Sequence, residues 1–307
     1  MSDYSIDLYK ISIIMFSMDT RKKSILADFM ILSSALLWGG EYVVVKDVLD
    51  YLSPCWVNAF RFIAASLLML PIFWRNFRNV SKKEVFAGFI LGVFLFAGFT
   101  LQTVGLVKTT AGKSGFLTAS YVVMVPFLVW LLKKEFPGFK ALICAGILIS
   151  GIALLSLDMG GGFNQGDLLT IIAAVSFACG IIGFDIYSKK YDPINLTILE
   201  MFTGGLLALV VAAFLEPVPN NISFGGKEIL QLVYLVVFGS IVCHLLSNVA
   251  LKWTNATHAS ILWSLESVFA MVFGILFLGE GMTLRIGIGF SLVLAAVLLT
   301  ELGGKSK

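Results

Sequence analysis

Apolar residues fill the chain in long runs that are separated by short polar connections. Most runs have the roughly 20 residues that an α-helix needs to cross about 30 Å of hydrocarbon. This pattern predicts an all-α membrane protein of ten transmembrane helices, with connections too short for a soluble domain. The ten runs cover residues 27–48, 54–74, 84–107, 113–133, 138–157, 167–188, 193–215, 228–251, 257–278 and 283–302.

Composition and charge agree with a bilayer environment. The 307 residues are 58% hydrophobic and 13% charged, whereas a soluble domain carries about twice that charged fraction. With the N terminus in the cytoplasm, sixteen lysines and arginines lie on the cytoplasmic side and five on the other, while Arg61 lies within a span. This asymmetry predicts a multi-pass protein of the cell membrane with both termini cytoplasmic. The net charge of +3 follows from that topology and gives no sign of nucleic-acid binding.

The two halves of the chain resemble each other. An alignment without gaps places Asp28 over Asp167, Pro54 over Pro193, and the segment GLVKTTAGKSGFL over ALKWTNATHASIL. Because each half has an odd number of helices, the second half enters the membrane from the opposite side, which makes an inverted repeat. The expected organisation is a cytoplasmic N-terminal segment (1–26), a first five-helix repeat (27–157), a glycine-rich linker (158–166), a second repeat (167–302) and a cytoplasmic tail (303–307).

Motifs in both halves resemble one family of transporters. WGGEYVVVK followed by SPCWVNAFRF, then FLTASYVVMVPFLVWLLKKE and ASILWSLESVFAMVFGILFLGE, are similar to the EamA-like branch of the drug/metabolite transporter superfamily. The resemblance runs from about Ala27 to Leu302. It implies a secondary transporter of small metabolites that hydrolyses no ATP. It also implies a central cavity lined by the first, third, fourth, sixth, eighth and ninth helices.

Polar residues inside the predicted spans mark candidate binding positions, because polar groups at membrane depth are costly and tend to be functional. Glu41 lies seven residues from the end of the first span, or about 10 Å deep, and Arg61 reaches the same depth in the second. Glu200 mirrors Arg61 in the second half. The candidate substrate-binding residues are Trp38, Glu41, Gln102, Tyr121, Phe177, His244, Asn248, Trp263 and Glu266.

Two interpretations of Glu41 follow from its depth. It can form an ion pair with Arg61 that makes two buried charges tolerable. Alternatively, it faces the cavity and binds a proton or a cationic group, with Trp38 and Tyr121 adding cation–π attraction. In the second case Glu41 is the proton-coupling residue, because proton and substrate compete for one carboxylate.

Other polar and small residues have structural explanations beside functional ones. His244 is either a proton relay or a histidine bonded to a neighbouring helix. Glu135 and Glu280 precede the fifth and tenth helices and are expected to cap their N termini. Gly88 and Gly92 form a GxxxG pair that permits close helix packing, and a homodimer stays open as an alternative.

These observations favour a secondary active transporter that works by alternating access and is coupled to protons. The favoured substrate is a small amine-bearing metabolite, cationic or zwitterionic, and the alternative is a passive facilitator or channel. An enzyme is disfavoured because no nucleophile, base and orienting residue are grouped. The four cysteines are scattered and only two histidines occur, so neither a metal site nor a cofactor is expected.

Overall fold

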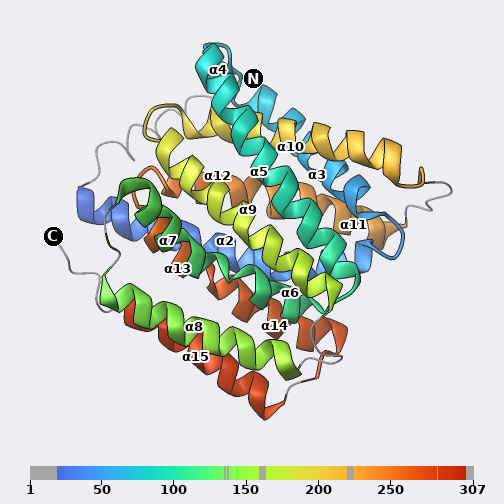
Figure 1. Cartoon of the computed structure of the whole chain (residues 1–307). Coiled ribbons are helices and arrows are strands. Elements are labelled where there is room, and N and C mark those ends of the chain that lie inside the picture. The colour runs from blue at the N-terminus through green and yellow to red at the C-terminus, as the bar shows by residue number, and fades with distance from the viewer. Residues whose placement is uncertain are drawn as a thin grey trace.

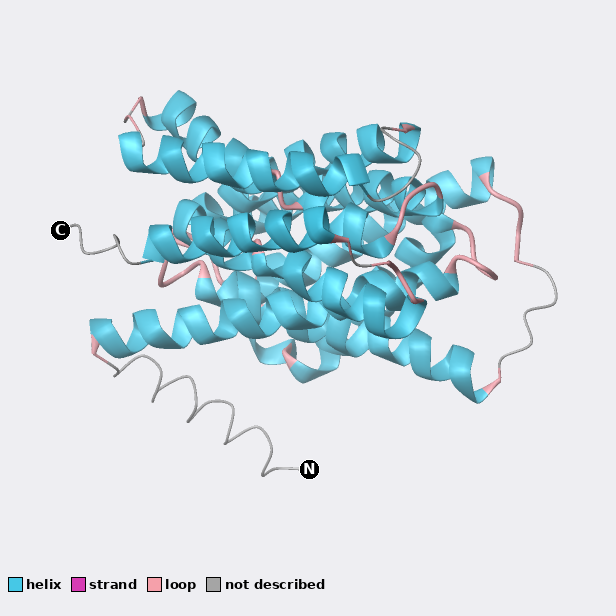
Figure 2. Cartoon of the chain, turned by 90° about the horizontal axis from the view of Figure 1, so that it is seen from below, coloured by secondary structure: helices cyan, strands magenta, loops and turns pink. Residues whose placement is uncertain are grey.

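The regular structure is helical throughout the part of the chain that the computed structural model describes, residues 19–134, 136, 138–158, 164–219, 225–281 and 283–301. Figure 2 shows helices that run side by side along roughly one direction, with no strand among the described residues. Eight helical segments are long and apolar enough to cross a membrane. The all-α prediction is therefore confirmed, and the protein is a multi-span membrane protein.

Most helices begin and end within a few residues of the predicted runs, but α2 begins at Thr20, seven residues before the first run. Local chemistry explains several of these ends, since Pro54 and Pro193 occupy the first turns of their helices and proline at that position loses no hydrogen bond. The first half consists of α2 (Thr20–Val48), α3 (Pro54–Ile72), α4 (Trp74–Phe77), α5 (Lys82–Val107), α6 (Ala111–Thr118), α7 (Tyr121–Lys133) and α8 (Phe139–Asp158). The second half consists of α9 (Gln165–Tyr187), α10 (Pro193–Leu215), α11 (Gly226–Val233), the π-helix η1 (Tyr234–Val242), α12 (Cys243–Ala250), α13 (Ala256–Trp263), α14 (Leu265–Leu278) and α15 (Leu284–Glu301).

The fifth and tenth predicted spans correspond to α8 and α15, which pack along each other at one edge of the bundle (Figure 1). Both are helices, but within the described residues their apolar stretches are the shorter segments 142–151 and 287–296. The number of clear spans is therefore eight, and the arrangement of ten spans in two inverted repeats stays a prediction.

The two halves interleave. Helix α3 packs along α10, α5 packs against both α9 and α10, and α14 packs along α2 (Figure 1). Small residues permit this contact. A side chain at Gly92 of α5 would meet the Glu200 backbone oxygen of α10 at 2.8 Å, and one at Gly39 of α2 would meet the Glu266 backbone oxygen of α14 at 3.0 Å. The central space of the bundle is therefore walled by helices of both halves.

Three predicted spans are not continuous α-helices, so that expectation was wrong: the eighth contains the π-helix η1, and the fourth and ninth are interrupted. The fourth breaks at Ala119 and Ser120, between α6 and α7, and the ninth breaks at Ser264, between α13 and α14. At both breaks, backbone hydrogen bonds join residues three positions apart instead of four. Ser120 N–H donates to Leu117 O, and Ser267 N–H donates to Ser264 O. An uninterrupted apolar run cannot reveal such breaks, because its hydrophobicity does not depend on the helical hydrogen-bond register.

Candidate functional site

A cavity lies among the helices of the described bundle. Its lining residues surround about 940 Å³ of space, which includes the part that opens to solvent. The helices that the resemblance implied all contribute to its wall, and α10 contributes as well. The structure brings together every predicted binding residue on this wall: Trp38, Glu41, Gln102, Tyr121, Phe177, His244, Asn248, Trp263 and Glu266.

Glu41 combines both predicted arrangements. One turn of α2 places it on the same face as Trp38, and both residues line the cavity. Its Oε1 accepts a hydrogen bond from Arg61 Nη1, which makes a buried ion pair. Arg61 is not among the residues that line the cavity, and its guanidinium lies against the rings of Phe62 and Phe99, at 4.4 and 4.3 Å from their centroids. Glu41 Oε2 has no hydrogen-bond partner among the described residues.

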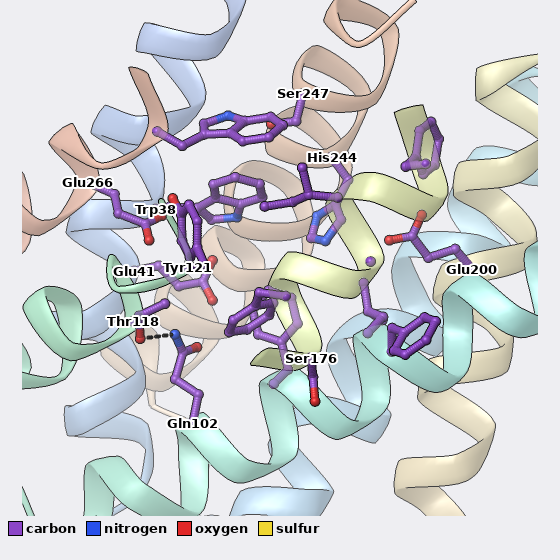
Figure 3. A pocket seen from close by; sticks show the side chains of 18 of the residues that line it. Trp38, Glu41, Gln102, Thr118, Tyr121, Ser176, Glu200, His244, Ser247 and Glu266 are labelled. Carbon is purple, nitrogen blue, oxygen red and sulfur yellow. Dashed lines mark hydrogen bonds between the residues drawn. The ribbon is translucent and has the colours of Figure 1, made fainter. Parts of the chain in front are cut away.

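A second carboxylate, Glu266, lies near Glu41 on the cavity wall (Figure 3). It begins α14 just after the break in the ninth span and is 5% exposed. The Tyr121 side chain is hydrogen-bonded to it. Close by, Gln102 Nε2 donates to the Tyr42 hydroxyl at 2.8 Å and to Thr118 Oγ1 at 2.9 Å. This part of the wall is therefore a polar network with one face open to the cavity.

Glu200 is a third cavity carboxylate, and it was not among the predicted binding residues. It lies on α10 and accepts a hydrogen bond from Asn248 Nδ2 at 3.3 Å, and the same amide donates to Thr197 Oγ1 at 2.9 Å. Figure 3 shows Glu200 across the cavity from Glu41 and Glu266. The sequence contained a signal for Glu200, because it is a carboxylate at membrane depth. The repeat alignment also places Glu200 at the position that corresponds to Arg61.

Aromatic rings line the same cavity as these carboxylates. Trp38 packs edge-on against His244, with ring centroids 5.4 Å apart, and lies 6.1 Å from Trp263. Phe99 packs edge-on against Phe177 at 5.0 Å. Faces and edges of these rings line the cavity, so a cationic nitrogen can lie against an aromatic face there.

His244 is held within its own helix. Its Nδ1 is 3.0 Å from the Ser240 backbone oxygen, one turn earlier. The expected bond to a neighbouring helix was therefore wrong, because the π-helical turns of η1 leave a carbonyl oxygen within reach of the ring. The adjoining Gly239 carbonyl instead accepts a hydrogen bond from Trp38 Nε1 at 3.1 Å, which orients the indole in the cavity.

Two ion pairs occupy corresponding positions at opposite ends of α2. The repeat alignment places Lys113 over His258 and Asp167 over Asp28. Lys113 Nζ lies 2.7 Å from Asp167, with side chains 1% and 0% exposed, and His258 Nε2 lies 2.8 Å from Asp28, with side chains 28% and 31% exposed. Each pair joins one half to the other.

Further hydrogen bonds join different segments at the end of the bundle that contains Lys113. Lys46 Nζ, near the end of α2, donates to the backbone oxygens of Leu106 and Thr109. Asp167 also accepts a hydrogen bond from Thr109 Oγ1 at 3.0 Å. Asp28 is 18 positions before Lys46 in α2, which corresponds to about 27 Å along the helix. The contacts of Asp28 and of Lys46 therefore lie near opposite ends of α2. The ion pair at the Lys113 end is therefore buried, whereas the His258 pair at the other end is partly exposed.

Glu280 caps a helix, but not the predicted one. Its carboxylate accepts hydrogen bonds from the backbone N–H groups of Ala111 and Gly112 at 2.7 and 3.1 Å, at the start of α6 in the opposite half. Gly279, with a φ of +66°, turns the chain back at the end of α14 and allows this approach. Burial raises the pKa of Glu280, and the two N–H donors partly offset that effect. Glu135 lies outside the described residues.

Comparisons with known proteins agree with this architecture. The chain matches the EamA-like transporter family twice, over residues 25–157 and 164–302, which confirms the resemblance. It is 33% identical to an uncharacterized transporter of Archaeoglobus fulgidus over 91% of this chain and 87% of the relative. It is 24% identical to the S-adenosylmethionine/S-adenosylhomocysteine transporter of Chlamydia muridarum over 83% of this chain and 85% of that protein. A crystal structure with 14% identity and a TM-score of 0.73 covers 90% of this chain and 96% of its own, and it has the same fold.

Proposed function

Because the chain belongs to the EamA-like transporter family, we propose that it is a secondary active transporter of a small amine-bearing metabolite, cationic or zwitterionic. The observation that carries this proposal is the charge of the cavity wall. Three carboxylates, Glu41, Glu200 and Glu266, line one cavity. Only Glu41 has an ion-pair partner among the described residues, Arg61.

Proton coupling follows from the cost of burying these groups. An ionised carboxylate without a counter-ion is expensive at membrane depth, so it must hold either a proton or a cation. Glu266 meets this condition, because it has no ion-pair partner among the described residues and lies near Glu41. A substrate ammonium held between Glu41 and Glu266 would replace the proton, and the reverse exchange would release the substrate. Trp38 and Tyr121 offer aromatic faces beside this position. Arg61 does not line the cavity, which argues against an anionic substrate bound by that guanidinium.

One relative supports a substrate of this charge. The protein of Chlamydia muridarum is named as a transporter of S-adenosylmethionine and S-adenosylhomocysteine. The first of these molecules carries a sulfonium and an ammonium group, and the second an ammonium group. A cavity with acidic and aromatic walls suits either kind of cation.

The repeated ion pairs support alternating access between two inverted five-helix repeats. In an inverted repeat, corresponding residues lie at opposite mouths of the path. The pairs Lys113–Asp167 and His258–Asp28 are then corresponding ion pairs, each of which closes one mouth of the transport path. We assign the Lys113 end to the outside and the His258 end to the cytoplasm, on the basis of the charge asymmetry of the connections.

This topology can be tested by labelling. Single cysteines at Asn79 and Lys190, both exposed, are expected to react with a membrane-impermeant thiol reagent only after cells are opened. A cysteine at Asp50, exposed at the other end, is expected to react in intact cells. The reverse pattern would contradict the assigned orientation of the repeats.

Glu41→Gln tests the proposed function. Uptake of amine-bearing substrates by the purified chain in liposomes, driven by an imposed proton gradient, is expected to fall by about tenfold or more, because the amide cannot exchange a proton or match an ammonium charge. Any remaining binding is expected to lose its dependence on pH. Proton-dependent uptake at the wild-type level in this variant would remove Glu41 from the mechanism.

A double variant controls for misfolding. Glu41→Gln leaves the buried Arg61 guanidinium without its carboxylate, which by itself destabilises a protein. In Glu41→Gln/Arg61→Gln both charges are gone, so folding is expected to recover while coupled uptake stays lost. The facilitator alternative predicts a different result, since wild-type flux would then be dissipative and insensitive to the proton gradient.

A further inference from the structure

We propose that the cavity recognises a substrate with two cationic nitrogens, one bound at Glu41 and Glu266 and the other at Glu200. This inference rests on the proposed function and specifies its substrate class. The simplest molecules of this kind are linear diamines, in which a short apolar chain separates two ammonium groups. Glu200 lies across the cavity from Glu41 and Glu266 (Figure 3), and aromatic residues line the same cavity.

The first nitrogen position is defined by an unsatisfied oxygen. Glu41 is 6% exposed and its Oε1 is held by Arg61, yet its Oε2 has no hydrogen-bond partner among the described residues. A buried acceptor without a donor costs free energy, and an ammonium N–H would satisfy it. Glu266 lies near it, and its partner among the described residues is the uncharged hydroxyl of Tyr121. A cation placed here gains both a hydrogen bond and charge compensation.

The second position lies across the cavity. Glu200 is 8% exposed, and its described hydrogen bond comes from the uncharged amide of Asn248. That amide is oriented by its second hydrogen bond, to Thr197 Oγ1. The amide therefore fixes one carboxyl oxygen of Glu200 without neutralising the charge. A second ammonium is the group that would do so, and Figure 3 shows Glu200 set apart from Glu41 and Glu266.

The wall between the two positions is mostly aromatic. Trp38, Phe99, Phe177 and His244 line the same cavity as the carboxylates and form a connected chain of ring contacts. Aromatic rings favour methylene groups through apolar contact and nitrogen cations through their faces. A molecule with charges at its two ends and an apolar middle therefore matches the cavity better than one with a single charged end.

The experiment compares matched ligands on the full chain in detergent and liposomes. The probes are 1,4-diaminobutane and 1,5-diaminopentane against butylamine and pentylamine, measured by competition with a labelled diamine and by thermal shift. Each diamine is expected to bind about tenfold or more tightly than the monoamine of the same length, since its second ammonium gains a charged hydrogen bond at Glu200. Equal affinity of diamines and monoamines for the wild-type protein would overturn the inference.

Variants locate the second position. Glu200→Gln is expected to bring the ratio of diamine to monoamine affinity close to one, and Glu200→Asp is expected to restore part of it. Glu228→Gln, the same change in α11 outside the cavity, is expected to keep the wild-type ratio. A diamine preference that survives in folded Glu200→Gln protein would also overturn the inference. If Glu200→Gln does not fold, the wild-type comparison and the Glu200→Asp ratio decide.

The outcome separates this inference from the proposed function. If diamines show no advantage but amines still move in a proton-dependent way, the substrate has one cationic nitrogen and the proposed function stands. If neither diamines nor monoamines bind or move, while an anionic or neutral metabolite does, the proposed function fails together with the inference.

Discussion

Replacing Asp167 by asparagine is expected to lower the free energy of unfolding by about 3–5 kcal/mol, as the breaking of a buried ion pair does in other proteins. The Lys113 ammonium lies 2.7 Å from this carboxylate and is 1% exposed. It would then face a neutral amide in a site from which water is excluded. Asp167 also accepts from Thr109 and completes the capping box of α9 with Asn164, so several contacts weaken together.

The corresponding pair at the other end supplies a matched control. Asp28→Asn removes the carboxylate that contacts His258, but both side chains are about one-third exposed, so the expected loss is below about 1 kcal/mol. Thermal and denaturant unfolding in detergent measure both variants. The double variant Lys113→Met/Asp167→Leu is expected to recover most of the stability, because it removes both buried charges. Equal losses in Asp167→Asn and Asp28→Asn would contradict the assigned difference between the two ends.

Replacing Gly39 by alanine is expected to destabilise the protein by about 1–3 kcal/mol and to weaken substrate binding, because overpacking forces backbones apart. The added methyl group would press against Phe269 and come within 3.0 Å of backbone atoms of Ala270 and Glu266 on α14. These atoms are not flexible side-chain ends. Helices α2 and α14 must therefore separate, and they carry two of the three cavity carboxylates.

A glycine elsewhere in the bundle provides the comparison. A methyl group at Gly146 in α8 meets nothing within 4 Å, so Gly146→Ala is expected to stabilise its helix by roughly 0.5–1 kcal/mol. Unfolding temperature and ligand affinity are measured for both variants. If Gly39→Ala matches Gly146→Ala in both measurements, the close approach of α2 and α14 is not required.

Local information was sufficient to predict the helices and their order. Hydrophobic runs located most helix ends to within a few residues, because a membrane-crossing helix must be apolar over a length that the bilayer sets. The start of α2 at Thr20 was missed by seven residues, since its first turns are polar. The same reasoning located the polar residues at membrane depth, and the structure places all nine predicted binding residues on one cavity wall. A costly polar group inside a span is visible in the sequence wherever the chain later folds.

Contacts between distant segments were decided by the tertiary structure alone. The sequence by itself determined that Glu41 and Arg61 lie at equal depth, but only the tertiary structure, in which α2 and α3 both pack against η1, determined that they pair. Glu280 was recognisable as a capping residue, yet it caps α6 in the opposite half rather than the helix that follows it. Glu200 became a cavity residue because α10 packs beside α12. Helical periodicity specifies which residues share a face. It contains no information about which helix that face will meet, because that choice depends on side-chain fit between segments far apart in the chain.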